Sequence, residues 1–254
     1  KEINKSVISW IIWSTIGFSL FFSALTLSSF YAPSWLVASS FQITIFAGAL
    51  LSPLFFPQNV DNTSGSQMNR IPFSLFPGFS LILTGVFLCN FSRIDSYNLS
   101  LVFKFIVLII IAAFSYPLGN RKIMVMVDSR LSTVERVFGM ILCNLPTLLI
   151  FMSISYNKVG LPPVSQVISA STVAIFSGLI ATNLYFHATD LVKSDSTSLA
   201  FVESTQVGEI FFSLLFGIYI LGNNLPTNLQ WIGVILIIAG MFLNSFVSKS
   251  IPKK

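Results

Sequence analysis

The sequence predicts an all-α polytopic membrane protein, a helical bundle of two inverted repeats with eight transmembrane helices visible of a presumed ten. Three observations support this fold class. The 254 residues are 54% hydrophobic and only 9% charged, whereas soluble domains are about 25% charged. Apolar runs of about 20 residues, long enough for a hydrocarbon layer of about 30 Å, recur from end to end. Two stretches of the chain also resemble each other.

Eight helices follow from the apolar runs and from the breakers between them. The segments "YAP" at 31–33, "GLPP" at 160–163 and "GNNLPTN" at 222–228 end such runs, because Pro, Gly and Asn favour turns. We interpret the stretches 57–70 and 119–136 as loops. The predicted helices cover residues 7–27, 33–55, 71–91, 99–118, 137–156, 164–188, 198–221 and 228–247. Together they form a single membrane domain, 1–254.

The basic residues predict the orientation of the chain. If Lys1 and Lys5 are cytoplasmic, eleven of the 14 Lys and Arg residues fall on that side. Arg93 and Lys158 fall on the other side, and Lys104 lies just inside the outer end of its helix. Cytoplasmic loops of membrane proteins carry this excess, so we expect both termini in the cytoplasm and the protein in the cell (plasma) membrane. The net charge of +5 does not indicate a nucleic-acid partner, because the basic residues lie between apolar runs.

An internal repeat aligns residues 21–42 with residues 185–206 without a gap, so that Gln42 falls on Gln206. Further along, "PGFSLILTGVFL" at 77–88 matches "IGVILIIAGMFL" at 232–243. Each of these two segments carries two glycines seven residues apart, at 78 and 85 and at 233 and 240. Glycines on one helix face let backbones approach closely in a membrane.

Equivalent helices of the two copies are five spans apart, so the copies run in opposite directions through the bilayer. Inverted repeats are typical of alternating-access transporters, whose substrate site lies near mid-membrane. The first copy, residues 1–95, shows three helices, and the second, residues 96–254, shows five. We therefore expect two N-terminal helices to be absent from this chain.

The segment "FVESTQVGEIFFSLL" at 201–215 places two acids inside an apolar run. At about 100° per residue, Glu203, Gln206, Glu209 and Ser213 share one face of the predicted helix. Glu209 lies near the centre of the bilayer, where a carboxylate costs at least about 2.5 kcal/mol and is a functional candidate. Such a group can exchange a proton for a cationic or polar substrate, or it can simply hydrogen-bond across helices. Gln42, the repeat counterpart of Gln206, belongs to the same candidate site.

His187, the only histidine, lies near the cytoplasmic end of its helix beside Asp190. One interpretation is a proton relay, and the other is an interfacial histidine satisfied by the neighbouring loop. Interfacial aromatic residues are expected at span ends. The tryptophans near predicted span ends are Trp10, Trp13, Trp35 and Trp231.

The sequence does not predict an enzyme. A single histidine excludes a His-rich metal site, and neither an HExxH pair nor a glycine-rich phosphate loop is present. Cys89 and Cys143 lie in separate apolar runs without partners at metal-ligand or redox spacing, which indicates packing roles. We therefore expect no cofactor and no metal.

Residues 178–243 resemble the C-terminal half of the drug/metabolite transporter superfamily (EamA-like). The most similar branch is the multidrug resistance efflux transporter family, whose "YPLGNRK" signature matches Tyr116 to Lys122. The resemblance implies ten helices in two inverted halves with cytoplasmic termini, of which this chain matches helices three to ten. The superfamily often has "LGE" where this chain has Leu221-Gly222-Asn223, so no ionisable role is expected at Asn223.

The sequence and the resemblance together favour a secondary active transporter that exports small organic compounds, such as cationic or drug-like molecules, in exchange for protons. The expected partners are the substrate, protons or another coupling ion, and the lipid bilayer; no feature indicates an oligomeric state. One alternative is uptake or exchange of a small metabolite such as a sugar or an amino-acid derivative. Another is a membrane scaffold or receptor that transports nothing.

Overall fold

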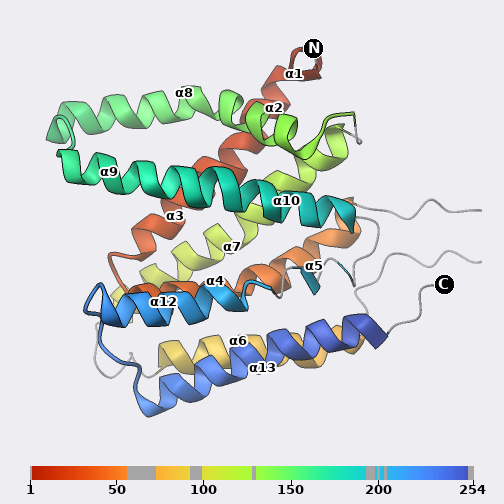
Figure 1. Ribbon diagram of the computed structural model, residues 1–254, viewed down its shortest axis with the longest axis vertical. Helices are drawn as coiled ribbons and strands as arrows, with labels where there is room; N and C mark the ends of the chain where they lie inside the picture. The colour runs from red at the N-terminus through yellow and green to blue at the C-terminus, as the bar shows by residue number, and fades with distance from the viewer. Residues whose placement is uncertain are drawn as a thin grey trace, which may run out of the picture. The chain divides into compact units, whose positions relative to one another are not determined.

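The computed structural model describes residues 2–55, 73–91, 99–127, 130–192, 198, 201–202 and 205–250, and every regular element in them is a helix (Figure 1). Six helices are long and apolar enough to cross a membrane: Val7–Ser28, Ser34–Leu51, Leu99–Val127, Thr133–Val159, Val164–Leu191 and Asn228–Val247. Two shorter apolar helices, Phe76–Phe91 and Val207–Tyr219, occupy the remaining predicted positions. The prediction of an all-α polytopic membrane protein is confirmed.

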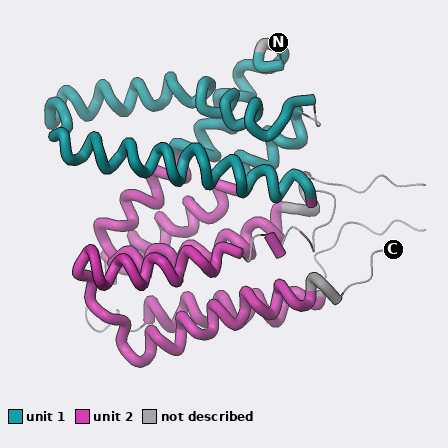
Figure 2. Tube along the Cα trace, viewed as in Figure 1, with its two compact units in different colours: residues 1–19, 118–191 teal, residues 20–117, 192–254 magenta. Residues whose placement is uncertain are grey.

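The chain divides into two compact units (Figure 2). Unit 1 consists of residues 1–19 and 118–191, and unit 2 of residues 20–117 and 192–254. Each unit draws on both predicted repeat copies, and helix α7 (Leu99–Val127) contributes to both. The repeat boundary at residue 95 stays a prediction.

Unit 1 is built around α8, against which α2 and α10 pack. Its elements are α1 (Glu2–Lys5), α2 (Val7–Ser14), most of the π-helix η1 (Thr15–Leu20), the end of α7, α8 (Thr133–Val159), α9 (Val164–Val173), the π-helix η3 (Ala174–Ala181) and α10 (Thr182–Leu191). The hydroxyl oxygens of Thr15 and Thr147 lie 2.9 Å apart. Ser19 Oγ donates to Asn144 Oδ1 at 2.8 Å. Such polar pairs hold helices together where water is absent.

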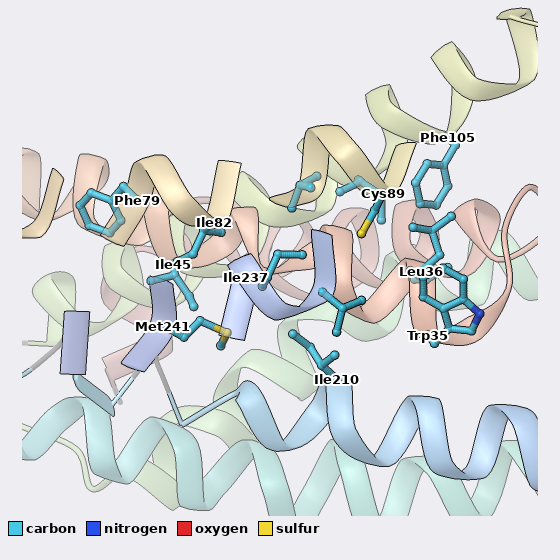
Figure 3. Close-up of a cluster of buried hydrophobic side chains, with 14 of the residues drawn as sticks. Trp35, Leu36, Ile45, Phe79, Ile82, Cys89, Phe105, Ile210, Ile237 and Met241 are labelled. Atoms are coloured by element: carbon cyan, nitrogen blue, oxygen red, sulfur yellow. The ribbon is translucent and has the colours of Figure 1, made fainter. Parts of the chain in front are cut away.

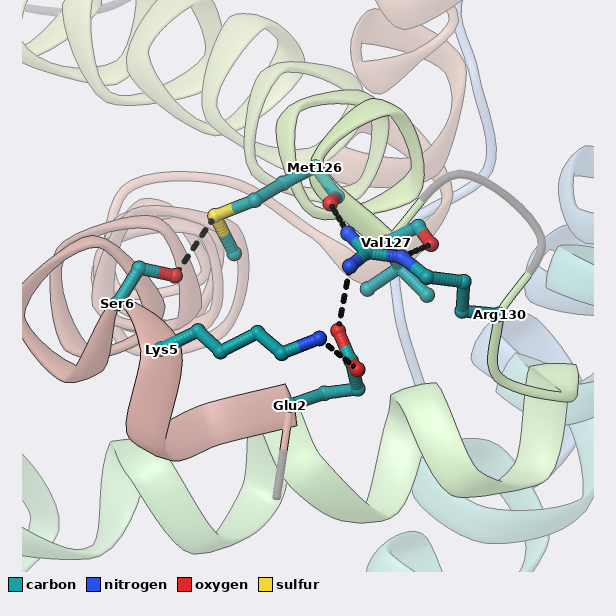
Figure 4. Close-up of polar contacts among 6 residues, drawn as sticks. All are labelled: Glu2, Lys5, Ser6, Met126, Val127 and Arg130. Atoms are coloured by element: carbon teal, nitrogen blue, oxygen red, sulfur yellow. Dashed lines mark hydrogen bonds and ion pairs between the residues drawn. The ribbon is translucent and has the colours of Figure 1, made fainter.

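A group of charges holds the N-terminal end of unit 1, ahead of the first span (Figure 4). Lys5 donates to Glu2 at 2.6 Å, and Arg130 lies 2.9 Å from the other oxygen of the same carboxylate. Arg130 also donates to the carbonyls of Met126 and Val127, which lie at the end of α7. The hydrogen bond from Lys5 and the positive charge of Arg130 lower the pKa of Glu2.

Unit 2 has a continuous apolar core (Figure 3). Its elements are α3 (Phe21–Ser28), α4 (Ser34–Phe41), α5 (Ile43–Phe55), the 3₁₀ turn η2 (Phe73–Leu75), α6 (Phe76–Phe91), the first part of α7, α12 (Val207–Tyr219) and α13 (Asn228–Ser250). The largest buried side chains include Trp35 from α4, Phe79 from α6 and Phe105 from α7. Ile210 and Ile237 bring α12 and α13 into the same cluster.

Helices α6 and α13 lie side by side (Figure 1). A Cβ atom added at Gly240 would lie 2.6 Å from the carbonyl oxygen of Gly78, and one at Gly233 would lie 2.7 Å from that of Gly85. Any side chain larger than hydrogen would push the two backbones apart. The predicted close approach at these four glycines is therefore confirmed.

Helix α7 continues to Val127, so the prediction of a loop from 119 is wrong there. The helix passes through Pro117, which has no N–H to offer the carbonyl of Ala113 four residues earlier. Thr44 Oγ1 donates to that carbonyl at 3.0 Å. A side chain from α5 thus satisfies the acceptor that the proline leaves open.

Helix α8 begins at Thr133 rather than at the predicted residue 137. Ser132 and Glu135 form a capping box, in which each side chain accepts from the backbone N–H of the other residue. This pattern satisfies two of the free donors at a helix start. The predicted loop therefore ends before Thr133.

Two of the tryptophans near span ends are buried within the protein. Trp10 is fully buried and its ring lies against Gly139. Trp35 is also buried, and its indole Nε1 donates to the carbonyl of Asn224 at 3.2 Å. A buried tryptophan needs such a partner for its N–H group.

Candidate functional site

The second span of the chain is broken at Gln42, between α4 and α5. The backbone N–H of Gln42 donates to Ser39 O three residues earlier, so the usual donor to Ala38 O is missing. The side-chain Nε2 of Gln42 donates to Ala38 O at 3.0 Å instead. The glutamine therefore satisfies the carbonyl that its own helix break frees, as a membrane interior requires.

A similar turn occurs at Gln206, the repeat counterpart of Gln42. Ile45 N donates to Gln42 O at 3.1 Å, and Glu209 N donates to Gln206 O at 2.9 Å. Both hydrogen bonds span three residues, and they occupy equivalent positions of the two predicted copies. Gln206 lies in a turn ahead of α12, so the prediction of one continuous helix over 198–221 is wrong.

Gln42 and Glu209 meet across these two turns. Gln42 is fully buried, and its Nε2 lies 3.4 Å from Glu209 Oε2, a long hydrogen bond. Glu209 is in the first turn of α12, where free backbone N–H groups favour a carboxylate. Among the described residues, Gln42 Oε1 has no hydrogen-bond partner. The buried amide of Gln42 therefore contacts the carboxyl group of Glu209, an exposed residue, and keeps its own oxygen Oε1 free to accept a further hydrogen bond.

The turn at Gln42 also contacts two other helices through its neighbours. Asn90 of α6 donates from Nδ2 to Ser40 Oγ at 3.1 Å. Thr44 bonds to α7 through the carbonyl of Ala113. Ser40, Gln42 and Thr44 are all buried, so this turn is the polar centre of unit 2.

For the other predicted site residues of this segment, the structure gives no side-chain hydrogen bond to Gln42 or Glu209 among the described residues. Ser213 lies four residues after Glu209 on α12, and its hydroxyl donates to Ile210 O at 3.0 Å. Gln206 Oε1 is buried and has no partner among the residues that the structure describes. Glu203 lies outside the described residues, so its predicted place on the polar face stays a prediction.

His187 belongs to unit 1 and lies in a different polar cluster. Arg136 Nη1 of α8 donates to Asp190 Oδ1 at 2.5 Å, and Thr133 Oγ1 donates to Asp190 Oδ2 at 2.7 Å. His187 Nδ1 lies 3.4 Å from the same threonine oxygen. The Arg136 guanidinium also lies over the ring of Phe186, with 5.5 Å between them. The cluster fixes the start of α8 to the end of α10.

Within the described parts of the chain, no group of three or more His, Cys, Asp or Glu side chains could hold a metal ion. The described polar side chains at the Gln42–Glu209 contact and its neighbouring turn residues are amides, hydroxyls and one carboxyl group. Such a set can bind a polar or cationic group and can take up or release one proton.

Sequence reasoning missed Asn90 and the ion pair of Arg136. Nothing in the spacing of Asn90 distinguishes it from other single polar residues in apolar runs. For Arg136, the motif from Ser132 to Glu135 was a usable signal, because a capping box marks a helix start.

This chain is similar to one protein family and to two bacterial proteins. A family model described as "Putative multidrug resistance efflux transporter" (EmrE) matches residues 1–250. The uncharacterized protein YjlA of Bacillus subtilis (strain 168) is 41% identical over 255 residues, which cover 100% of this chain and 78% of YjlA. An uncharacterized 42.1 kDa protein of Shouchella clausii, encoded in the 3′ region of an intracellular alkaline protease, is 41% identical over 209 residues, covering 82% of this chain and 54% of that protein.

Proposed function

The chain belongs to the family of multidrug resistance efflux transporters, and from that premise we propose that it exports small cationic or drug-like compounds in exchange for protons. Glu209 is the coupling group and Gln42 is its partner. The family implies a small-molecule substrate and a membrane environment. The coupling ion, the charge of the substrate and the direction of transport are parts of the proposal.

The contact between Gln42 and Glu209 carries this proposal. Glu209 is the only carboxyl group among the described residues of unit 2. An acid within the apolar part of a membrane protein is costly and is found where ions or protons are handled. The buried amide of Gln42 orients it at 3.4 Å.

Exchange follows from the two charge states of one carboxyl group. The ionised form balances a bound cation where the dielectric constant is low. Protonation removes this charge and releases the cation, so that cation and proton compete for the same group. The amide of Gln42 suits both states, because its N–H donates to the carboxylate and its open Oε1 accepts from the protonated acid.

The arrangement of basic residues supports a place in the cell membrane with both termini in the cytoplasm. In that orientation eleven of the 14 Lys and Arg residues are cytoplasmic, as the positive-inside rule requires. Labelling of single cysteines introduced at each terminus of the protein, in sealed cells and in permeabilised cells, tests this orientation.

Transport of ethidium into proteoliposomes tests the proposal. The vesicles are loaded with acidic buffer and diluted into alkaline buffer, so that protons leave as the cation enters. We expect the wild-type protein to accumulate ethidium and Glu209→Gln to lose the accumulation that the pH gradient drives. Glu2→Gln, which removes a carboxyl group ahead of the first span, should behave as the wild type.

Three outcomes would count against this function. Accumulation by Glu209→Gln at the wild-type rate would exclude coupling at this residue. Accumulation by the wild type that ignores the pH gradient would indicate uptake or exchange without protons. A wild-type protein that moves neither ethidium nor neutral sugars or amino-acid derivatives would favour a scaffold or receptor.

A further inference from the structure

A groove of about 210 Å³ opens on the surface of unit 2 between α4, α6 and α7. Its rim is formed by Phe87 and Phe91 of α6, whose side chains are 60% and 48% exposed. Its floor includes Phe105 and Ile109 of α7, which are fully buried. Because Phe87 and Phe91 are exposed on an apolar helix, acyl chains of a bilayer can reach the groove.

One end of the groove is polar, where Asn90 and Ser40 meet. Asn90 is 4% exposed, and its Nδ2 donates to Ser40 Oγ at 3.1 Å and to Val86 O at 2.9 Å. The carbonyl of Val86 can only accept, so the amide nitrogen must face it and the orientation of the amide is fixed. Among the described residues, Asn90 Oδ1 has no hydrogen-bond partner.

This open acceptor defines the ligand. A buried carbonyl oxygen without a donor is unfavourable, and a ligand hydroxyl or N–H group would satisfy it. None of the described side chains that line the groove is acidic or basic, so these side chains offer no counterion to a charged group. The acyl chain of a phospholipid would fill the apolar part but would leave the oxygen unpaired.

The volume limits the size of the ligand. At about 30 Å³ for each water-sized group, 210 Å³ holds roughly seven such groups, the size class of a medium-chain alcohol. We propose that this groove is a lateral binding site for a neutral amphiphile with one hydroxyl or N–H donor, which hydrogen-bonds to Asn90 Oδ1. The groove shares Ser40 and Ile43 with the turn at Gln42 but is not lined by Gln42 or Glu209, and its binding does not depend on the transport function proposed above.

Two probes of equal size test the site without any variant. Hexan-1-ol and methyl pentyl ether have the same atoms, but only the alcohol can donate a hydrogen bond. Saturable binding to the purified protein in nanodiscs is measured by NMR line broadening, after subtraction of partition into empty nanodiscs. We expect the alcohol to bind about tenfold more tightly than the ether, as one hydrogen bond predicts.

Three variants locate this binding. Asn90→Leu should lower the affinity for the alcohol about tenfold, so that the preference over the ether disappears. Ile106→Phe, which fills the groove, should abolish saturable binding of both probes. Ile110→Phe adds the same ring one helix turn away, at a side chain that does not line the groove, and should bind both probes as the wild type does.

The proposal is overturned if the wild type binds the two probes equally or binds neither saturably. It is also overturned if Asn90→Leu or Ile106→Phe retains the preference for the alcohol. If Asn90→Leu does not fold, the wild-type comparison and Ile106→Phe decide alone. Glu209→Gln should bind both probes normally, which keeps the result distinct from a failure of proton coupling.

Discussion

The hydrogen bond from Thr44 to the carbonyl of Ala113 can be tested by mutation. This carbonyl lacks its usual helical donor because Pro117 has no N–H group. In Thr44→Val the side chain keeps its shape and loses its donor. Thr44 is 4% exposed and Ala113 is fully buried, so no water replaces the hydroxyl. We expect Thr44→Val to destabilise unit 2.

The expected loss of stability in Thr44→Val is estimated from the cost of leaving a buried carbonyl without a hydrogen bond, about 1–3 kcal/mol. Hydrogen bonds between membrane helices are weaker, with an average of about 0.6 and a maximum of about 1.7 kcal/mol. We therefore expect a loss of about 1 kcal/mol, or about fivefold in the unfolding equilibrium. In a Pro117→Ala background the alanine N–H donates to Ala113 O, so Thr44→Val should cost less than about 0.5 kcal/mol.

The coupling between Thr44 and Pro117 is measured by reversible unfolding in mixed micelles. The four proteins compared are the wild type, Thr44→Val, Pro117→Ala and the double variant. Thr172→Val is a matched control, because the Thr172 hydroxyl is exposed and donates to Ile168 O of its own helix. The control should change stability by less than about 0.5 kcal/mol. An equal cost of Thr44→Val with and without Pro117 would refute the compensation argument.

Two further predictions use the same unfolding measurement. Gly240→Ala places a Cβ atom 2.6 Å from the carbonyl oxygen of Gly78, so it should lower the stability by about 1–3 kcal/mol. Gly178→Ala is the control, because its Cβ atom would meet nothing closer than 4.0 Å, and it should not destabilise the protein. Equal stability of the two variants would show that the α6–α13 contact is loose. Asp190→Asn leaves the Arg136 guanidinium, 4% exposed, without its counterion and should cost about 3 kcal/mol; a loss below about 0.5 kcal/mol would mean that the ion pair is solvated.

The sequence was informative where a property depends on spacing along one helix. The glycine pairs at 78 and 85 and at 233 and 240 were visible as a shared face, and the structure brings them together. Among the described residues, the apolar runs located the six helices that are long enough to cross a membrane, because the length of a span is set by the bilayer. The acid at Glu209 was singled out by its place on a polar helix face and by its predicted depth in the bilayer.

The helix breaks were not predictable in this way. Gln42 interrupts its span because a side-chain amide replaces a backbone donor, and nothing in the local pattern separates this from an ordinary helical glutamine. The predicted helix ended at residue 118, yet α7 continues through Pro117 to Val127, and Thr44, more than 70 residues before Pro117 in the chain, satisfies the carbonyl that the proline frees. Both outcomes depend on contacts that form only in the folded protein.

Competition between cation binding and protonation at Glu209 is measured by counting the protons that are released when ethidium binds. Ethidium is added to the purified protein in a lightly buffered detergent solution, and a pH-sensitive dye reports the release. We expect proton release by the wild type and by Glu2→Gln, and none by Glu209→Gln. Release by Glu209→Gln equal to that of the wild type, or ethidium binding to the wild type without release, would contradict it.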